Sequence, residues 1–221
     1  MLKIAPEGWP FVLAGTLSAL GLAALARFCS GSAGAGAALA TLAAVALTFF
    51  FFYFFRDPER RTPERADAFI SPADGRIIVS ENVVESRYFN EPRRQISIFM
   101  SPANVHVNRS PCDGTVISAR HNTGKHFAAF REGASLRNEN SELVLETRFG
   151  RILVRQVAGL IARRTVCRVG PGAHLRPGER FGIIKFSSRL DVYLPANCTT
   201  QVVLGDTVRA GETILAVMPQ A

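Results

Sequence analysis

Four short segments place reactive polar side chains among the prolines and glycines that fix a backbone. They are FFRDPER (54–60), SPADG (71–75), FMSPANVHVNRSPCDG (99–114) and FGIIKFSSRLDVYLP (181–195). A serine hydroxyl such as that of Ser188 is a poor nucleophile near pH 7, so it needs a base and donors that stabilise an oxyanion. His106 is the candidate base or proton shuttle, because imidazole titrates near working pH. Asp74 is the candidate carboxylate that orients it.

Other reaction chemistries have no motif in this chain. There is no C-x-x-C or H-E-x-x-H pattern, no Walker-type phosphate loop and no G-x-S-x-G elbow. The histidines lack the spacing of zinc ligands, and two lie in the polar stretch HNTGKHFAAF, where we expect loop residues. The four histidines are His106, His121, His126 and His174. We therefore expect no metal site.

Short strands are the elements that must position these residues. β-Branched or alternating runs, separated by Gly, Pro, Asn and Asp, recur after residue 56: GRIIVSENVV, QISIFM, GTVISA, ELVLETRFGRILVRQV, FGIIKF, LDVYLP and ETILAVM. Two of them join as a hairpin across Phe149 and Gly150. His106 and Asn108 alternate with valines, which places both on one face of a strand. Only VAGLIARR (157–164) has helical character, so the domain is predicted to be mainly β.

Glycine turns indicate which mainly β fold the domain adopts. GDTVRAGETILAVM (205–218), and more loosely PGAHLRPGERFGIIKF (171–186), place a turn, a hydrophobic residue, a second glycine and a strand in succession. This pattern resembles the barrel-sandwich hybrid of lipoyl and biotinyl domains. Those carriers present a modifiable lysine, whereas the equivalent turns here carry arginine, so we expect no carrier function. The predicted fold class is a compact, mainly β, lipoyl-like domain of short strands, preceded by a transmembrane helical hairpin.

The hairpin is predicted from the uneven distribution of charge. Residues 1–55 contain only Lys3, Glu7 and Arg27 as charged side chains, so of the net charge of +8 they hold +1 and residues 56–221 hold +7. Two uncharged runs, 9–25 and 35–55, each approach the roughly 20 residues that a helix needs to cross a bilayer. We predict a membrane anchor at 1–55 and one domain at 56–221. The alternative is a cleaved signal peptide followed by a single anchor.

Arginines after the second run predict which side of the membrane the domain occupies. The run ends in a cluster of aromatic residues, and the arginines that follow are Arg56, Arg60, Arg61 and Arg65. This arrangement is typical of the cytoplasmic end of a span, although Arg27 in the intervening turn argues mildly against it. Anionic lipid is the expected partner of a basic domain beside a membrane. No basic helix, aromatic RNA-reading motif or zinc finger occurs, so nucleic acid is not expected.

Together and in this order, the four segments resemble the phosphatidylserine decarboxylase family, specifically its short form. The resemblance extends from about Phe54 to Pro195. It implies a self-processing proenzyme, in which a serine attacks the preceding carbonyl and becomes a pyruvoyl group through an ester, β-elimination and hydrolysis. The family's FGSR signature matches Phe186, Ser187, Ser188 and Arg189. Ser188 is then the pyruvoyl precursor, residues 1–187 the β subunit and residues 188–221 the α subunit.

The resemblance also implies the reaction. The pyruvoyl ketone would form a Schiff base with the substrate's amine and take up the electron pair left by CO2, and His106 is our first choice to protonate the α-carbon. Donors to the anionic headgroup are expected from Asn108, Arg109 and Arg189. The predicted function is decarboxylation of phosphatidylserine to phosphatidylethanolamine by an α/β heterodimer at the cytoplasmic face of the cell membrane. Higher oligomers are left open.

Two residues depart from the family pattern. Longer members carry a second histidine at the position of Arg109, so the residue that activates Ser188 stays open. The residue before the reactive serine is Ser187 rather than glycine, and glycine reaches strained backbone conformations without a Cβ penalty. Ser187 could slow cleavage, shift it to the bond between Phe186 and Ser187, or mark an unprocessed relative.

Two other functions compete with this prediction. The first is the same chemistry on an ether-linked serine phospholipid, because the lipid chains would touch only apolar surface. The second is an uncleaved, non-catalytic, membrane-anchored lipoyl-like binding domain, which would leave SPADG, NVHVN and FSSR without a reason. The apolar run HFAAF (126–130) could touch acyl chains or lie in the core.

Overall fold

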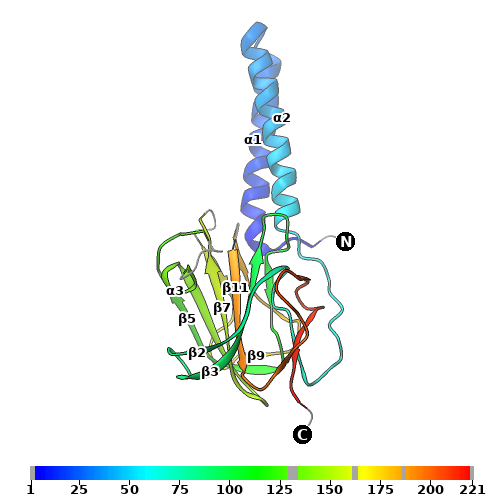
Figure 1. The fold of residues 1–221 in the computed structure, drawn as a ribbon. Coiled ribbons are helices and arrows are strands. Elements are labelled where there is room, and N and C mark those ends of the chain that lie inside the picture. The colour runs from blue at the N-terminus through cyan, green and yellow to red at the C-terminus, as the bar shows by residue number, and fades with distance from the viewer. Residues whose placement is uncertain (1–2, 129–133, 161–163, 186–187, 220–221) are drawn as a thin grey trace. The chain divides into compact units, whose positions relative to one another are not determined.

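The computed structural model describes residues 3–128, 134–160, 164–185 and 188–219. The chain divides into two compact units, Met1–Pro58 and Glu59–Ala221. The first is helical and the second is mainly β (Figure 1).

A helical hairpin forms the first unit. A 3-10 turn, η1 (Pro6–Gly8), leads into α1 (Trp9–Phe28), and α2 (Gly31–Phe54) runs back along it. The rings of Phe11 and Phe51 lie 5.3 Å apart. Gly15 lets the helices approach, because a Cβ there would lie 2.5 Å from Thr48 Oγ1. Both helices are long and apolar enough to cross a membrane, so the prediction of two hydrophobic N-terminal helices is confirmed.

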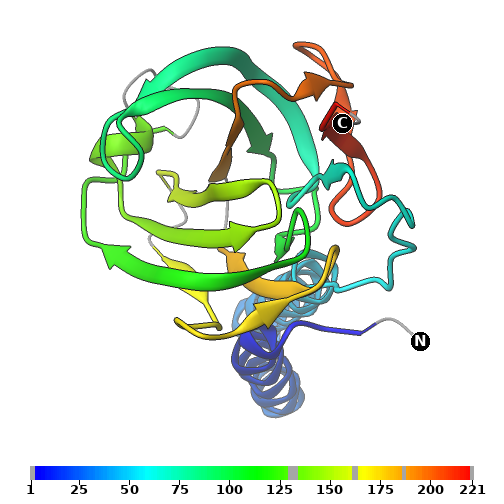
Figure 2. The same ribbon diagram turned by 90° about the horizontal axis from the view of Figure 1, so that it is seen from below.

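An eight-stranded antiparallel sheet is the framework of the second unit. It curls into a half barrel, which Figure 2 shows from below. Its strands, in order across the sheet, are β13 (Thr207–Val208), β2 (Gly75–Glu85), β3 (Glu91–Met100), β11 (Ser188–Pro195), β7 (Gly150–Ala158), β6 (Asn140–Thr147), β5 (Gly114–Asn122) and β9 (His174–Leu175). The predicted hairpin at Phe149 and Gly150 joins β6 to β7, and Gly150 has a φ of 89°, which glycine adopts without Cβ strain.

Two three-stranded sheets complete the unit. One contains β1 (Ala68–Ile70), β14 (Ile214–Val217) and β12 (Thr199–Thr200), and the other β4 (Val107–Arg109), β10 (Arg180–Ile184) and β8 (Thr165–Cys167). The mainly β prediction is confirmed. The prediction of helical character at 157–164 is wrong at its start, because Val157 and Ala158 pair with β6 and β11 as the end of β7. A short helix, α3 (Ala134–Arg137), lies elsewhere, and His121 lies in β5 rather than in a loop.

The two faces of the large sheet differ in character. Alternate residues of β3 and β11 point into an apolar core, among them Ile96, Ile98, Leu190 and Val192. The intervening residues of β11 are Arg189, Asp191 and Tyr193, and they are also buried, on the opposite face. Cys112 and Cys198 belong to the core and Cys167 packs against it, so all three pack as small hydrophobes.

Two loops of the unit repeat one pattern. In SPADG (71–75) and SPCDG (110–114) the serine hydroxyl donates to the carbonyl two residues later, at 2.7 Å in both. The loops are joined reciprocally, since the amide of Ile70 donates to the Pro111 carbonyl and the amide of Arg109 to the Pro72 carbonyl, at 2.7 and 2.9 Å. The amides of Gly211 and Gly178 donate to the serine carbonyls, both at 2.8 Å. Four distant segments therefore meet at these turns.

Candidate active site

Ser188 is the first residue of β11 and lies between two strands. Its cross-strand neighbours are Met100 of β3 and Ala158 of β7. The residue is fully buried, and its hydroxyl lies 3.4 Å from Met100 Sδ. Alternation along β11 directs the side chain to the face that carries Leu190 and the apolar core. The flanking strands β3 and β7 thus hold the backbone of Ser188 on both sides, and its side chain is buried away from water.

Two buried amides lie beside this serine. Asn108 Nδ2 approaches the sulfur of Met100 at 3.9 Å, so Asn108 and Ser188 share a neighbour. Gln156 Nε2 donates to Asn108 Oδ1 at 2.8 Å. In the described part of the chain, Gln156 Oε1 is buried without a hydrogen-bond partner. Gln156 was not among the predicted site residues, and the signal for it was the pair of adjacent polar residues, Arg155 and Gln156, within the apolar sequence ILVRQVA.

His106 is held at the entry to β4, two residues before Asn108. Its Nδ1 lies 2.9 Å from the carbonyl oxygen of Asn104. The Asn104 side chain accepts hydrogen bonds from the amide and hydroxyl of Ser101, at 2.9 and 2.8 Å. If Nδ1 donates to this carbonyl, a neutral imidazole carries its lone pair on Nε2. The turn therefore sets the tautomer in which Nε2 is the basic nitrogen.

Asp74 is bound by two groups from distant segments. Arg60 Nη2 donates to both carboxylate oxygens, at 3.1 and 2.8 Å, and the amide of Ala210 donates to Oδ1 at 2.8 Å. Arg60 also pairs with Glu212 at 3.2 Å. The side chains of Arg60 and Asp74 are 9% and 11% exposed. The first two sequence segments are thus joined by a largely buried ion pair, and Arg60 was not a predicted site residue.

The side chain of Arg109 lies beside Arg60 of this ion pair, away from the side chain of its sequence neighbour Asn108. Its Nη1 donates to the carbonyl of Gly178 at 3.0 Å. A Cβ built on Gly211 would lie 2.9 Å from Arg109 Cδ and 3.5 Å from Arg60 Cβ, so the two arginines lie side by side. Alternation along β4 explains why neighbouring residues contact different partners.

Arg189 lies on the opposite face of β11 from the Ser188 side chain. Its guanidinium donates to Asp191 and, at 2.9 Å, to the hydroxyl of Ser97. It lines a cavity of about 490 Å³ on that face together with Gln95, Ser135, Arg155 and Tyr193. Of the predicted headgroup donors, only Asn108 shares a neighbour with the Ser188 hydroxyl.

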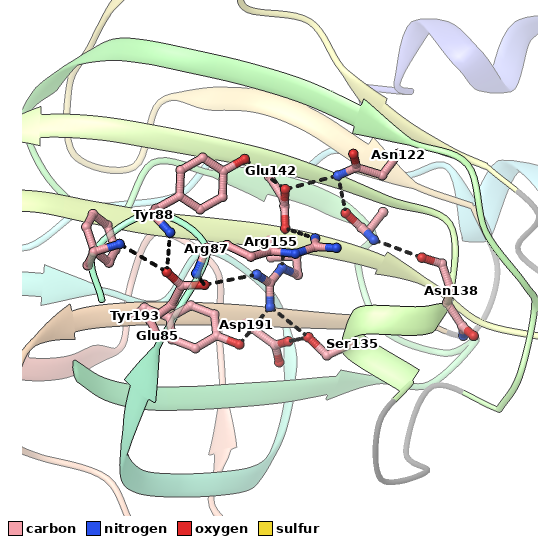
Figure 3. A network of polar contacts seen from close by, with 12 residues as sticks. Glu85, Arg87, Tyr88, Asn122, Ser135, Asn138, Glu142, Arg155, Asp191 and Tyr193 are labelled. Carbon is pink, nitrogen blue, oxygen red and sulfur yellow. Dashed lines mark hydrogen bonds and ion pairs between the residues drawn. The ribbon is translucent and has the colours of Figure 1, made fainter. Parts of the chain in front are cut away.

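A buried network supports this second face (Figure 3). Arg155 donates to Glu142 at 2.8 Å and to the hydroxyl of Tyr193 at 2.8 Å, and lies 3.5 Å from Glu85. Burial raises the pKa of Tyr193 to about 12, with the charge of Asp191 adding to the effect. Burial alone would raise the pKa of Glu142, but the charge and hydrogen bonds of Arg155 and its neighbours outweigh it and lower that pKa. The network is thus an ionised framework behind β11.

Two further predictions concern the residue before Ser188 and metal binding. Ser187, the predicted residue before the cleavage point, lies outside the described residues. In the part of the chain that the structure describes, no group of three or more His, Cys, Asp or Glu side chains could hold a metal ion.

Comparison with known proteins identifies the family. The family model for phosphatidylserine decarboxylase matches residues 47–216. Phosphatidylserine decarboxylase proenzymes from Aromatoleum aromaticum and Citrifermentans bemidjiense are 46% and 44% identical, each over 98% of this chain and over 96% and 97% of the relative. The proenzyme of Geotalea uraniireducens is 49% identical over 75% of this chain and 78% of its own. The matched region contains Ser188, His106 and Asp74. The chain therefore belongs to the phosphatidylserine decarboxylase family.

Proposed function

We propose that this chain decarboxylates phosphatidylserine to phosphatidylethanolamine after cleaving itself between Ser187 and Ser188. The observation that carries the proposal is the fully buried hydroxyl of Ser188 at the start of β11, beside the Asn108 and Gln156 amides. The family's proenzymes supply the reaction and its lipid substrate by name.

The first step is an acyl shift within the chain. The Ser188 hydroxyl oxygen bonds to the carbonyl carbon of Ser187 while the peptide C–N bond breaks, which leaves an ester and a free amine on residue 188. Loss of the α-proton of residue 188 then breaks the bond between its Cβ and the ester oxygen, which leaves with Ser187 as a C-terminal carboxylate and cuts the chain. Water hydrolyses the resulting dehydroalanine to a ketone with release of ammonia. His106 is the candidate base, since its Nδ1 contact with the Asn104 carbonyl favours a basic Nε2.

The surroundings of Ser188 fit the pyruvoyl group that this sequence would create. After cleavage, residue 188 would keep its pairing with β3 and β7, so the new terminus would stay in place. The unsatisfied Gln156 Oε1 offers an acceptor to a substrate amine. A pyruvoyl group at this place would supply a carbonyl that accepts the electron pair released with CO2.

The chain's own residues would bind the headgroup and return the proton. Asn108 would orient polar atoms next to residue 188, and His106 would protonate the α-carbon. Arg109 and Arg189, the other predicted donors, are bound to the Gly178 carbonyl and to Ser97, so they would have to leave these partners to reach the phosphate or the carboxylate of the headgroup. The basic domain, +7 over residues 56–221, would lie on the cytoplasmic side, where anionic lipid attracts positive charge.

Intact mass of the purified full chain, together with CO2 release from phosphatidylserine, tests the proposal. We expect a small fragment that begins with a blocked residue at position 188, and CO2 release from the same sample. Ser188→Ala removes the attacking oxygen, so we expect a single uncut chain of 24.0 kDa and no CO2.

The matched control is Ser187→Gly, which leaves the nucleophile and relaxes the backbone before it. This variant should cleave at least as fast as the parent chain. An uncut parent chain would instead favour the non-catalytic binding domain, and undiminished CO2 release by Ser188→Ala would exclude the pyruvoyl mechanism.

A further inference from the structure

The end of the large sheet that carries Ser188 gathers several loops. The strand register brings together the start of β11, the ends of β3 and β7, the start of β6 and the end of β5. The described residues that follow or precede these strand ends are 123–128, 134–139, 159–160, 164 and 185. They therefore border the candidate active site.

Backbone hydrogen bonds tie these segments to the strand ends and to each other. The amide of Lys125 donates to the Arg137 carbonyl at 2.8 Å, within the connection between β5 and β6, and the amide of Ala158, at the end of β7, donates to the Glu139 carbonyl at 2.9 Å. The amide of Lys185 donates to the Arg164 carbonyl at 3.2 Å. Residues far apart in sequence are thus held in one surface.

Two exposed leucines and several basic residues occupy this surface. Leu136 is 57% exposed and Leu160 is 63% exposed. Lys125, Arg137 and Arg164 are exposed as well. We call these five residues the Ser188 rim. The one acidic side chain in the described part of the same loops, Glu139, is half-buried and accepts a hydrogen bond from the Thr165 amide at 3.2 Å.

We propose that the Ser188 rim inserts its leucines into the interface of an anionic phospholipid bilayer, which brings the headgroups to residue 188. Apolar side chains flanked by lysine and arginine are the combination that binds the headgroup and acyl boundary of anionic membranes. Among the described residues of this surface only two large apolar side chains are exposed, few for a stable protein interface of about 800 Å² per partner, and its positive charge complements anionic lipid. The inference rests on the proposed function, because that function requires a substrate that stays in the bilayer.

Ile117 provides a comparison away from the Ser188 end. It is 40% exposed and lies in β5. Ile117 is five residues from Asn122 along this strand, and therefore about 16 Å from the Ser188 end. An anchored domain that touched the membrane anywhere on its surface would treat Ile117 and Leu160 alike.

The test uses tryptophan fluorescence in the full chain, reconstituted in nanodiscs with or without brominated acyl chains. Trp9 is the only tryptophan, so Leu160→Trp, Leu136→Trp and Ile117→Trp are each made with Trp9→Phe. A rim side chain seated about 5–10 Å into the headgroup boundary should lose roughly half of its emission in brominated lipid. The Ile117→Trp emission should stay unchanged. Equal quenching at positions 160 and 117 would overturn the proposal.

Charge is tested by adding Arg137→Gln and Arg164→Gln to the Leu160→Trp chain. Quenching should fall in nanodiscs that contain phosphatidylglycerol, and Arg148→Gln with Arg151→Gln, at the opposite end in the β6–β7 hairpin, should leave it unchanged. Quenching that is equal in phosphatidylglycerol and in pure phosphatidylcholine would overturn the anionic preference.

The readout separates this inference from the proposed function. Quenching at the rim without CO2 release from added phosphatidylserine would support the surface and reject the enzyme. CO2 release without quenching at the rim would support the enzyme and reject the membrane surface.

Discussion

At the residue scale, the central feature is the small set of buried polar groups around Ser188. The serine and the amides of Asn108 and Gln156 are each fully buried, and a buried amide without its hydrogen bonds costs free energy. The unsatisfied Oε1 of Gln156 is such a cost. Its position beside the predicted nucleophile is explained if a substrate group completes the hydrogen bond.

His106 is the residue whose role can be tested most directly. Replacing it with Ala should lower CO2 release per cleaved chain by about 100-fold, the contribution expected of a positioned proton donor. Borohydride trapping of the substrate amine on the α fragment should persist, because that step does not need this proton. Intact mass gives the amount of α fragment for normalisation.

The matched control is His174→Ala, since the His174 side chain is exposed and pairs with Asp113 at 3.3 Å. It should leave turnover unchanged. If His106→Ala chains never cleave, His106 is assigned to the earlier step as the base for Ser188. Normal cleavage with normal turnover would show that another residue carries the proton.

At the element scale, β11 separates two environments because its side chains alternate. One face packs Ser188 and Leu190 toward the core, and the other holds Arg189 and Asp191 beside the network around Arg155 (Figure 3). A buried ion pair contributes little net stability, but removal of one partner leaves the other charge uncompensated. The network should therefore be sensitive to single substitutions.

Glu142→Gln should destabilise the second unit by about 3 kcal/mol, at the lower end of the cost of breaking a buried pair, because Arg87 keeps the network partly in water. Urea unfolding at pH 7 measures this difference. Glu146→Gln is the control on the same strand, since Glu146 pairs with Arg151 in an exposed position, and its effect should be about 0–1 kcal/mol.

The Glu142 carboxylate also predicts how the stability of the fold depends on pH. Despite burial, the pKa of Glu142 is lowered in the folded chain from its ordinary value of 4.5, chiefly by the charge of Arg155, so the unfolded chain binds more protons in acid. The stabilisation is fully present above pH 4.5 and is lost as the pH falls through the lowered value. The parent chain should lose this stability in acid and Glu142→Gln should not. Parallel pH profiles for the two chains would contradict the assignment.

At the scale of the whole molecule, the second unit contains a complete core. The buried residues of its main apolar cluster lie between Phe69 and Ala216, within the second unit. The segment just after the helices nevertheless contributes Arg60, which pairs with Asp74. The limits of an independently folding fragment should therefore depend on this arginine.

A chain of residues 59–221 should fold without the helices, with a cooperative thermal transition. Within this fragment, Arg60→Met should cost about 3 kcal/mol, because Asp74 would keep a largely buried charge without its partner. Arg61→Met changes the neighbouring, exposed arginine and should leave the transition unchanged. Equal transitions for the two variants would show that the ion pair does not stabilise the fold.

The sequence by itself determined the mainly β domain, the two apolar helices, the glycine turns and the four segments that resemble the decarboxylase family. These are local properties: strand alternation, uncharged runs and positive-φ turns depend on residues close together in the chain. The helical character expected at 157–164 was wrong at its start for the complementary reason, because cross-strand partners in β6 and β11 override weak local preference at Val157 and Ala158.

Only the tertiary structure decided which side chains meet. Ser188, Met100, Asn108 and Gln156 come from four strands, and their contact depends on the register of β11 with β3 and β7 and on the packing of β4 below them. The same register turns Arg189 away from the Ser188 hydroxyl, and the loop contacts place Arg109 beside Arg60. Strand pairing between distant segments sets these positions, and no spacing within a single segment encodes it.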